Sequence, residues 1–352
     1  MTHAQENTSS TIASDWPTLL KDNRRTGGRE DAAARAPKKV RWQARLGSSI
    51  RSAPVLGNGL LYVTTVGGTV FAIEGNTGRT RWKFQIKDQI HSTPSFWKNL
   101  LLFGSDSGAV YAVDADLGVK VWEASANGEV WTSPVTAAGV VYFGSADARL
   151  YAVEAETGRQ KWAQEFGGRI YSTAFAATDA IYFGCGDGNV YCVEATSGKA
   201  MWHTSTGNGI DSSPALAGDT LLIGSEDFFF YALDSKNGAV KWKYETGLGI
   251  ASSPVVAGQL VVIGSKDGYL YALEIPTGRL VWKAHVGGVV TAPPVIADDV
   301  VCIQSWGTLA FEISTGKEAW RAGVGGAVQS APVLTKDAMY LASLDGDVYA
   351  LE

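Results

Sequence analysis

One position in a repeating pattern carries residues of very different chemistry. Its first seven occurrences lie 40 residues apart and the last follows after 38: Arg51, His91, Trp131, Tyr171, Asp211, Ala251, Thr291 and Gln329. The residue before each is always Ile or Val, and the residue after is Ser, Thr or Ala. Constant positions in a repeat hold the fold, whereas a variable position between constant neighbours is free to carry function. We therefore expect these side chains to circle one shared site; solvated strand starts are the alternative interpretation.

The side chains of this set suit the binding of a protein, a peptide or a small ligand. The planar guanidinium of Arg51 can hold a carboxylate or phosphate, and Trp131 and Tyr171 offer flat surfaces to an aromatic or cationic group. His91 and Asp211 are the candidates for acid–base catalysis. The expected ligand-binding residues are Arg51, His91, Trp131, Tyr171, Asp211 and Gln329. A second tier is expected from the preceding residues Gln89, Glu129, Arg169 and Asn208, with Asp88.

The elements that must position these residues come from a repeat of about 40 residues. Tryptophan sets its register at Trp42, Trp82, Trp122, Trp162, Trp202, Trp242, Trp282 and Trp320. A proline, or alanine in one copy, stands 12 residues after each: Pro54, Pro94, Pro134, Ala174, Pro214, Pro254, Pro294 and Pro332. An aromatic or apolar residue follows at Phe71, Tyr111, Tyr151, Tyr191, Tyr231, Tyr271, Leu309 and Tyr349. These three positions keep nearly the same spacing through eight copies, which excludes a chance origin of the repeat.

Each copy contains four strand-like pieces, which in the sixth copy are SSPVVAG, LVVIGS, YLYALEI and RLVWKAH. Residues 266–268 form an Asp-Gly hairpin turn, and residues 276–278 form a second turn that ends on glycine. Four strands per copy without helical periodicity predict a propeller blade. We therefore expect an all-β fold, an eight-bladed β-propeller of four-stranded antiparallel blades over residues 39–352, preceded by an N-terminal arm at residues 1–38.

The ends of the chain predict how the propeller closes. The last copy stops at Glu352, before its fourth strand, while a surplus strand, VRWQARL around Trp42, precedes the first copy. Joining the two completes the last blade and leaves no open sheet edge. The seventh copy lacks two residues between Ser305 and Leu309, so its second hairpin should be short.

The repeat resembles the pyrroloquinoline-quinone-like (PQQ-like) propeller family, whose signature is A-x-D-x-x-T-G-x-x-x-W. One copy carries Ala112, Asp114, Gly118 and Trp122; another carries Ala272, Glu274, Thr277, Gly278 and Trp282. The resemblance implies that each register tryptophan docks between adjacent blades. It also implies that quinone enzymes of this fold use a vicinal cysteine pair, calcium and an aspartate base. The cysteines here are Cys185, Cys192 and Cys302, none adjacent to another. We therefore expect no quinone or other cofactor and no metal, and a member that is not a PQQ-dependent dehydrogenase.

The composition of the chain indicates which kinds of partner and which cellular compartment to expect. With 30 basic and 35 acidic residues the net charge is −5, which argues against a nucleic-acid partner. No segment reaches the roughly 18 apolar residues of a membrane span. Residues 1–15 show no signal peptide, so we expect a cytoplasmic protein; assembly lipoproteins of similar fold are, by the resemblance, secreted and lipidated.

Two local departures from the repeat suggest contact surfaces. Phe228, Phe229 and Phe230 stand where other copies have glycine or small residues, and Trp306 lies in the shortened copy. Exposed aromatics would form an apolar patch for a partner; packing on a neighbouring blade is the alternative. The sequence thus leads to a rigid scaffold that binds a protein, peptide or small ligand at the channel mouth or blade rims. The alternative is an enzyme with the ring of variable residues as its active site.

Overall fold

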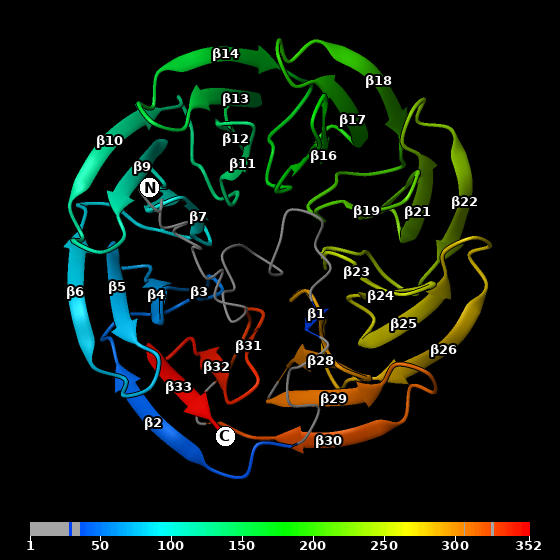
Figure 1. The fold of residues 1–352 in the computed structure, drawn as a ribbon. Helices are drawn as coiled ribbons and strands as arrows, with labels where there is room; N and C mark the ends of the chain where they lie inside the picture. The colour runs from blue at the N-terminus through cyan, green and yellow to red at the C-terminus, as the bar shows by residue number, and fades with distance from the viewer. Residues whose placement is uncertain (1–27, 30–35, 306, 325–326) are drawn as a thin grey trace, which may run out of the picture.

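The computed structural model describes residues 28–29, 36–305, 307–324 and 327–352. Their strands form eight sheets, blades I to VIII in chain order, arranged around a central axis (Figure 1). In each blade four antiparallel strands are hydrogen-bonded in sequence from the axis to the periphery, except that the outermost strand of blade VIII comes from the start of the chain. This is the eight-bladed β-propeller that the repeat predicts.

The innermost strands are short and stand nearest the axis. They are β3 (Val55–Gly57), β7 (Ser95–Trp97), β11 (Val135–Ala137), β15 (Phe175–Ala176), β19 (Ala215–Ala217), β23 (Val255–Ala257), β27 (Val295–Ala297) and β31 (Val333–Leu334). The second strands are β4 (Leu60–Thr64), β8 (Leu100–Gly104), β12 (Val140–Gly144), β16 (Ala180–Gly184), β20 (Thr220–Gly224), β24 (Leu260–Gly264), β28 (Val300–Gln304) and β32 (Met339–Ala342).

The third and fourth strands of each blade lie further out. The third strands are β5 (Thr69–Glu74), β9 (Ala109–Asp114), β13 (Arg149–Glu154), β17 (Asn189–Glu194), β21 (Phe229–Asp234), β25 (Tyr269–Glu274), β29 (Thr308–Glu312) and β33 (Asp347–Leu351). The outermost strands are β6 (Thr80–Gln85), β10 (Lys120–Ser125), β14 (Gln160–Glu165), β18 (Ala200–Ser205), β22 (Val240–Glu245), β26 (Leu280–His285), β30 (Glu318–Ala322) and β2 (Val40–Arg45).

Strand β2 closes the ring by pairing antiparallel with β33. Trp42 faces Ala350 and Arg45 faces Asp347 in this register. The backbone of Lys39 and Glu352 exchanges two further hydrogen bonds, of 3.1 and 3.0 Å, and the Glu352 carboxylate forms an ion pair of 2.6 Å with Arg41. The predicted closure by an N-terminal strand is therefore confirmed.

One strand of the expected arm also contacts the propeller. β1 (Gly28–Arg29) pairs in parallel with β27, so that Gly28 faces Ile296 and Arg29 faces Ala297. Since β27 is the innermost strand of blade VII, β1 becomes a fifth strand on the axial side of that sheet (Figure 1).

Adjacent blades are joined by indole hydrogen bonds that repeat around the ring. Trp82 Nε1 donates over 2.8 Å to the carbonyl oxygen of Ala115, which lies 33 residues further on in the next blade. The bond recurs with the same spacing from Trp42, Trp122, Trp162, Trp202 and Trp242, and with a spacing of 31 from Trp282. Tyr62 donates its hydroxyl to the same carbonyl over 3.1 Å. A carbonyl oxygen has two lone pairs, so one acceptor satisfies both buried donors.

Candidate binding site on the loops of blades II to VI

The variable residues of the repeat lie four residues before the first residue of each innermost strand, and equivalent positions of adjacent blades are neighbours. The residue before each is buried, as Ile90 and Val130 are. The residue after each helps join the blades: Ser92 Oγ donates over 2.9 Å to the carbonyl of Thr132, 40 residues on. Ser252 Oγ and Ala292 repeat this bond at 2.9 Å. Residues 40 apart are therefore held side by side, which brings the variable side chains into contact.

Three variable residues form a continuous row of aromatic rings across blades II, III and IV. The ring centroids of His91 and Trp131 lie 5.1 Å apart. Trp131 and Tyr171 are stacked, with centroids 4.8 Å apart and an angle of 16° between the rings. The Arg169 guanidinium lies 5.1 Å from the centroid of Tyr171 and extends the row by a cation–π contact. Trp131 remains 40% exposed, so the row is open to a ligand.

A carboxylate that the sequence analysis did not select fixes the start of this row. Asp106 Oδ1 accepts a hydrogen bond of 2.8 Å from Trp131 Nε1 and lies 2.9 Å from His91 Nδ1. Asp106 is itself partly buried. One oxygen thus orients both rings, and a charged acceptor makes each of these bonds stronger than a bond between neutral groups.

Charged residues continue the site over blades IV, V and VI. Lys266 Nζ lies 2.7 and 2.8 Å from the two carboxylate oxygens of Glu226. Asp211 and Arg169 line the same pocket as this pair, which has a volume of about 580 Å³. Burial of the Asp211 carboxyl raises its pKa above the ordinary value, although the charge of Arg169 acts in the opposite sense. We name the whole group the polar–aromatic cluster; it comprises His91, Asp106, Trp131, Arg169, Tyr171, Asp211, Glu226 and Lys266.

Three members of the cluster come from the second hairpin of their blades, which the sequence analysis interpreted only as a turn. Asp106, Glu226 and Lys266 occupy one repeat position, whose other copies include Val66, Ala146, Gly186 and Leu344. The backbone N–H at this position bonds to the second-tier position of the same blade, as from Asp106 to Gln89 over 3.1 Å. The residue type at this position varies among the copies, although the position lies between a constant residue and a turn. That variability is the signal that could have identified it as part of the site.

The structure does not bring all the predicted residues together. Arg51 and Gln329 are exposed, and within the described ranges neither forms an ion pair or ring contact with the cluster. His91 and Asp211 each have separate surroundings, and no hydrogen bond joins them in that part of the chain. In the second tier, Arg169 joins the cluster and Asn208 lines its pocket. Asp88 instead accepts a hydrogen bond of 2.5 Å from the Ser107 backbone.

The three consecutive phenylalanines do not form one exposed patch. Phe230 is fully buried and Phe228 is 43% exposed, while Phe229 packs under Lys243, whose Nζ lies 4.0 Å from its ring centroid. Side chains alternate between the two faces of a strand, so three in a row cannot all be exposed. Phe228 has a φ of +78°, at the place where Gly68, Gly108 and Gly188 stand in other copies. Trp306 lies outside the described residues.

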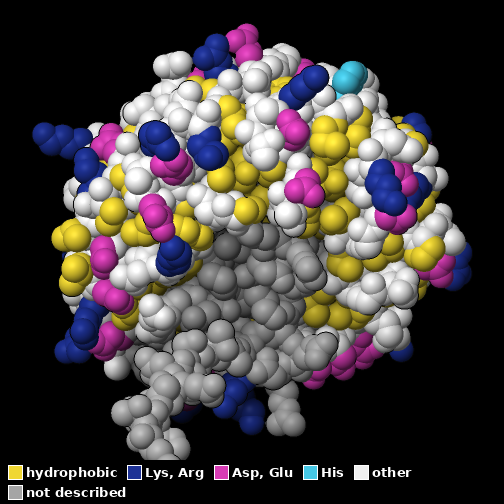
Figure 2. All heavy atoms as spheres, turned by 45° about the horizontal axis from the view of Figure 1, so that its top comes forward, with side chains coloured by type: hydrophobic (Ala, Val, Ile, Leu, Met, Phe, Trp, Pro, Cys, Tyr) yellow, Lys and Arg dark blue, Asp and Glu magenta, His cyan; other side chains and the backbone are white. Residues whose placement is uncertain are grey.

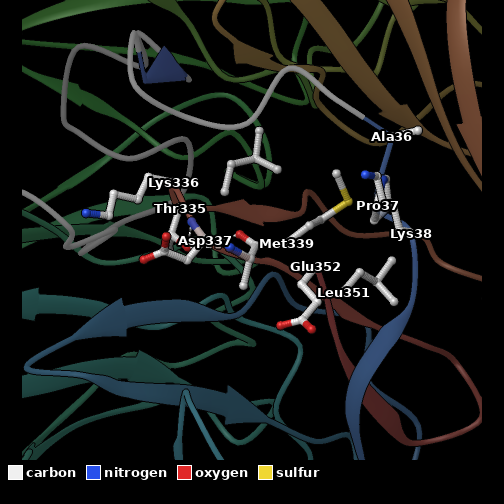
Figure 3. A pocket seen from close by; sticks show the side chains of 11 residues that line it. Ala36, Pro37, Lys38, Thr335, Lys336, Asp337, Met339, Leu351 and Glu352 are labelled. Atoms are coloured by element: carbon white, nitrogen blue, oxygen red, sulfur yellow. Dashed lines mark hydrogen bonds between the residues drawn. The ribbon is translucent and has the colours of Figure 1, made fainter.

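A second pocket lies at the seam of blade VIII, where β2 begins and the chain ends (Figure 3). Its volume is about 210 Å³. Met339 and Leu351 are buried at its base, between Pro37 and the turn at residues 335–337 (Figure 3). Its lining is mainly apolar and belongs to the closure of the ring, so it offers no set of groups for chemistry.

The surface carries both signs of charge. Lys and Arg side chains are interspersed with Asp and Glu over the face seen in Figure 2, without a basic stripe of the kind that tracks a nucleic-acid backbone. Across the described residues, no helix is long and apolar enough to cross a membrane.

Eight four-stranded antiparallel blades around a central axis are the architecture of a PQQ-like β-propeller. The chain belongs to the family described as outer membrane protein assembly factor BamB, whose model matches residues 24–95, 77–170 and 163–352. The structure is similar to BamB from Moraxella catarrhalis, with 18% identity, a TM-score of 0.78 and coverage of 89% of this chain and 99% of that one. No curated protein matches the sequence.

Two dehydrogenases of known structure share the same fold. Quinohemoprotein alcohol dehydrogenase from Comamonas testosteroni is 16% identical, with a TM-score of 0.83 over 96% of this chain and 80% of that chain. A europium-containing methanol dehydrogenase is 12% identical, with a TM-score of 0.82 over 96% and 98%. At such identities the likeness concerns the fold alone.

The residues of this chain do not fit a quinone–metal site. Cys185, Cys192 and Cys302 are all buried as free thiols, and none adjoins another in sequence. Over the described residues no group of three or more His, Cys, Asp and Glu side chains is placed to hold a metal ion. We therefore derive no chemistry through such a group.

Proposed function

We propose that this propeller is a binding scaffold and that the polar–aromatic cluster on the loops of blades II to VI is its recognition surface. The row of rings from His91 through Trp131 to Tyr171 carries this proposal. Fold-holding contacts repeat in every blade, whereas this row occurs on three adjacent blades and leaves Trp131 open to solvent. Exposed tryptophan is costly to leave in water without a use, and it is among the residues most enriched at the centres of binding surfaces.

The composition of the cluster favours a partner with both apolar and charged groups. Trp131 supplies a flat surface, and Arg169, Asp211 and the Glu226–Lys266 pair supply directional polar contacts. The family description, an outer membrane protein assembly factor, supports a protein as the partner. A rigid ring of blades suits this role because a preorganised surface loses little conformational freedom on binding.

A photo-crosslinking experiment tests the proposal directly. A benzophenone amino acid is placed at Trp131 in one variant and, as a control, at the exposed residue Lys161 on outer strand β14. Both proteins are irradiated in extracts of the source cells, and adducts are identified by mass spectrometry. We expect a defined adduct from position 131 only. Equal labelling at both positions, or none at position 131, would show that the cluster is ordinary surface.

One observation supports an enzyme as a second candidate function. The His91 ring is held by the Asp106 carboxylate at 2.9 Å, an arrangement that orients an imidazole for proton transfer. His91 is one of the two catalytic candidates from the sequence; Asp211, the other, lies in the pocket beside Arg169. Under this candidate, His91→Gln abolishes turnover of a substrate identified at the cluster while leaving its binding within about threefold. Unchanged turnover in His91→Gln eliminates the catalytic role.

A further inference from the structure

The pocket beside Arg169 and Asp211 exists because side chains are missing from two repeat positions. Gly186 occupies the hairpin position that carries Asp106, Glu226 and Lys266 in other blades. Gly209 occupies the second-tier position that carries Arg169 in the preceding blade. A Cβ on Gly186 would lie 2.9 Å from Arg169 Cγ, and one on Gly209 would lie 3.2 Å from the Gly186 carbonyl oxygen. These glycines keep the space between blades IV, V and VI open and expose backbone at its base.

Two opposite charges line this space without an ion pair to any described residue. The Lys266–Glu226 pair is complete, since the ammonium contacts both carboxylate oxygens. Arg169 contacts the Tyr171 ring, and within the described residues its guanidinium forms no ion pair. Asp211 likewise accepts no hydrogen bond from any described residue. Over the described part of the chain, the pocket therefore holds one cation and one anion on adjacent blades that have no ion-pair partner.

We propose that this pocket binds a small zwitterion that carries a carboxylate and a primary ammonium group, as a free amino acid does. The guanidinium of Arg169 receives the carboxylate through two parallel N–H donors, a geometry that a planar fork provides. The carboxylate of Asp211 receives the ammonium, which gains a charged acceptor in a partly desolvated place. Each half of the ligand replaces a missing partner, so neither protein charge remains unpaired.

The arrangement of charges around the pocket favours a zwitterionic ligand over a simple anion or a simple cation. An anion alone would satisfy Arg169 and be repelled by Asp211 and Glu226; a cation alone would meet the opposite conflict with Arg169 and Lys266. A ligand with both charges avoids both conflicts. The inference deepens the proposed function, because it names what one part of the recognition surface binds.

Calorimetric titration of the intact protein with four probes at equal ionic strength tests the inference. Two probes, glycine and γ-aminobutyrate, carry both charges at different separations. The other two, acetate and methylammonium, carry a single negative and a single positive charge. We expect glycine or γ-aminobutyrate to bind at least about tenfold more tightly than acetate or methylammonium. We expect Arg169→Ala and Asp211→Asn each to weaken that binding by about tenfold or more. Arg81→Ala, which removes an exposed arginine on outer strand β6, serves as the matched control.

The results separate this inference from the proposed function. If acetate binds as tightly as glycine and only Arg169→Ala has an effect, the pocket is an anion site and the inference is wrong. Absence of binding by all four probes also overturns it. A Trp131 crosslink obtained alongside either result would leave the scaffold proposal standing, whereas loss of the crosslink with zwitterion binding intact would remove only the larger partner.

Discussion

At the scale of single residues, Asp106 shows how one carboxylate oxygen can orient the side chains of a recognition surface. It accepts from Trp131 and contacts His91, so its removal leaves two partly buried ring nitrogens without their partner. We expect Asp106→Ala to lower the free energy of unfolding by about 1 to 2 kcal/mol. Urea unfolding measures this, with Asp116→Ala at an exposed turn of the same blade as control. Equal stability of Asp106→Ala and wild type would mean that Asp106 holds neither ring.

A second residue-scale prediction concerns Asp211, whose raised pKa couples stability to pH. The folded protein binds this proton more tightly than the unfolded chain, because burial opposes the charge more than Arg169 and Lys266 support it. The stability from the protonated form is full below the ordinary pKa of 3.8 and is lost as pH rises through the folded value. We therefore expect Asp211→Asn to be more stable than wild type at pH 7, with the difference vanishing near pH 4.

Thermal midpoints at pH 4, 5.5 and 7 check the Asp211 prediction. Asp116→Asn controls for the substitution itself. A midpoint of Asp211→Asn that falls below wild type at pH 7 would show that Asp211 is stabilised by a partner rather than penalised by burial. Together with weaker zwitterion binding, the expected result would make Asp211 a residue kept for function at a cost in stability.

These residues also mark how far the sequence could predict the site. The 40-residue spacing correctly placed His91, Trp131 and Tyr171 beside one another, because equivalent positions of adjacent blades must be neighbours. The hairpin position of Asp106, Glu226 and Lys266 was interpreted only as a turn, although its variability among the copies is the same kind of signal. Ligand binding by Arg51 and Gln329 stays a prediction: the spacing fixes backbone positions, whereas side-chain length and rotamer decide which groups meet.

At the scale of elements, the hairpin between β20 and β21 contains a strained residue. Phe228 adopts a φ of +78° where five of the other copies have glycine, and Ala148 does so with a φ of +68°. This conformation costs a residue with a side chain about 1 kcal/mol. We expect Phe228→Gly to raise the free energy of unfolding by up to about 1 kcal/mol, less the flexibility that glycine gives the unfolded chain. Strain that persists suggests a use for the exposed ring.

The matched variant for this prediction is Ala148→Gly, at the same hairpin position of blade III. Both are compared with wild type by urea unfolding, and Phe228→Gly is also tested in the Trp131 crosslinking assay. A loss of more than about 1 kcal/mol in Phe228→Gly alone would mean that the ring is a packing anchor.

Fold prediction was most reliable for such elements, since turn and strand signals recur in every copy. The phenylalanine run misled because its strand alternation was not applied to all three residues.

At the scale of the whole molecule, the ring depends on the pairing of its two ends. Deleting residues 39–46 removes β2, the Trp42 indole bond to Gly75 and the partner of β33. It also exposes the edge of blade VIII. We expect this deletion to lower the free energy of unfolding by several kcal/mol, since Trp42 is a buried aromatic residue. Deletion of residues 1–14, which contain no repeat landmark, is the control, and calorimetry compares the two. Similar thermal midpoints for both deletions would contradict the closure.

The same closure has a consequence for how the protein is made. Strand β2 precedes the complete blades in the chain, whereas its partner β33 follows them, and Trp42 faces Ala350. Blades I to VII can each assemble on the blade made before it, but β2 has no partner strand until β33 has been synthesised. The nascent chain therefore carries one unpaired strand while the other blades form, and blade VIII is completed only after them.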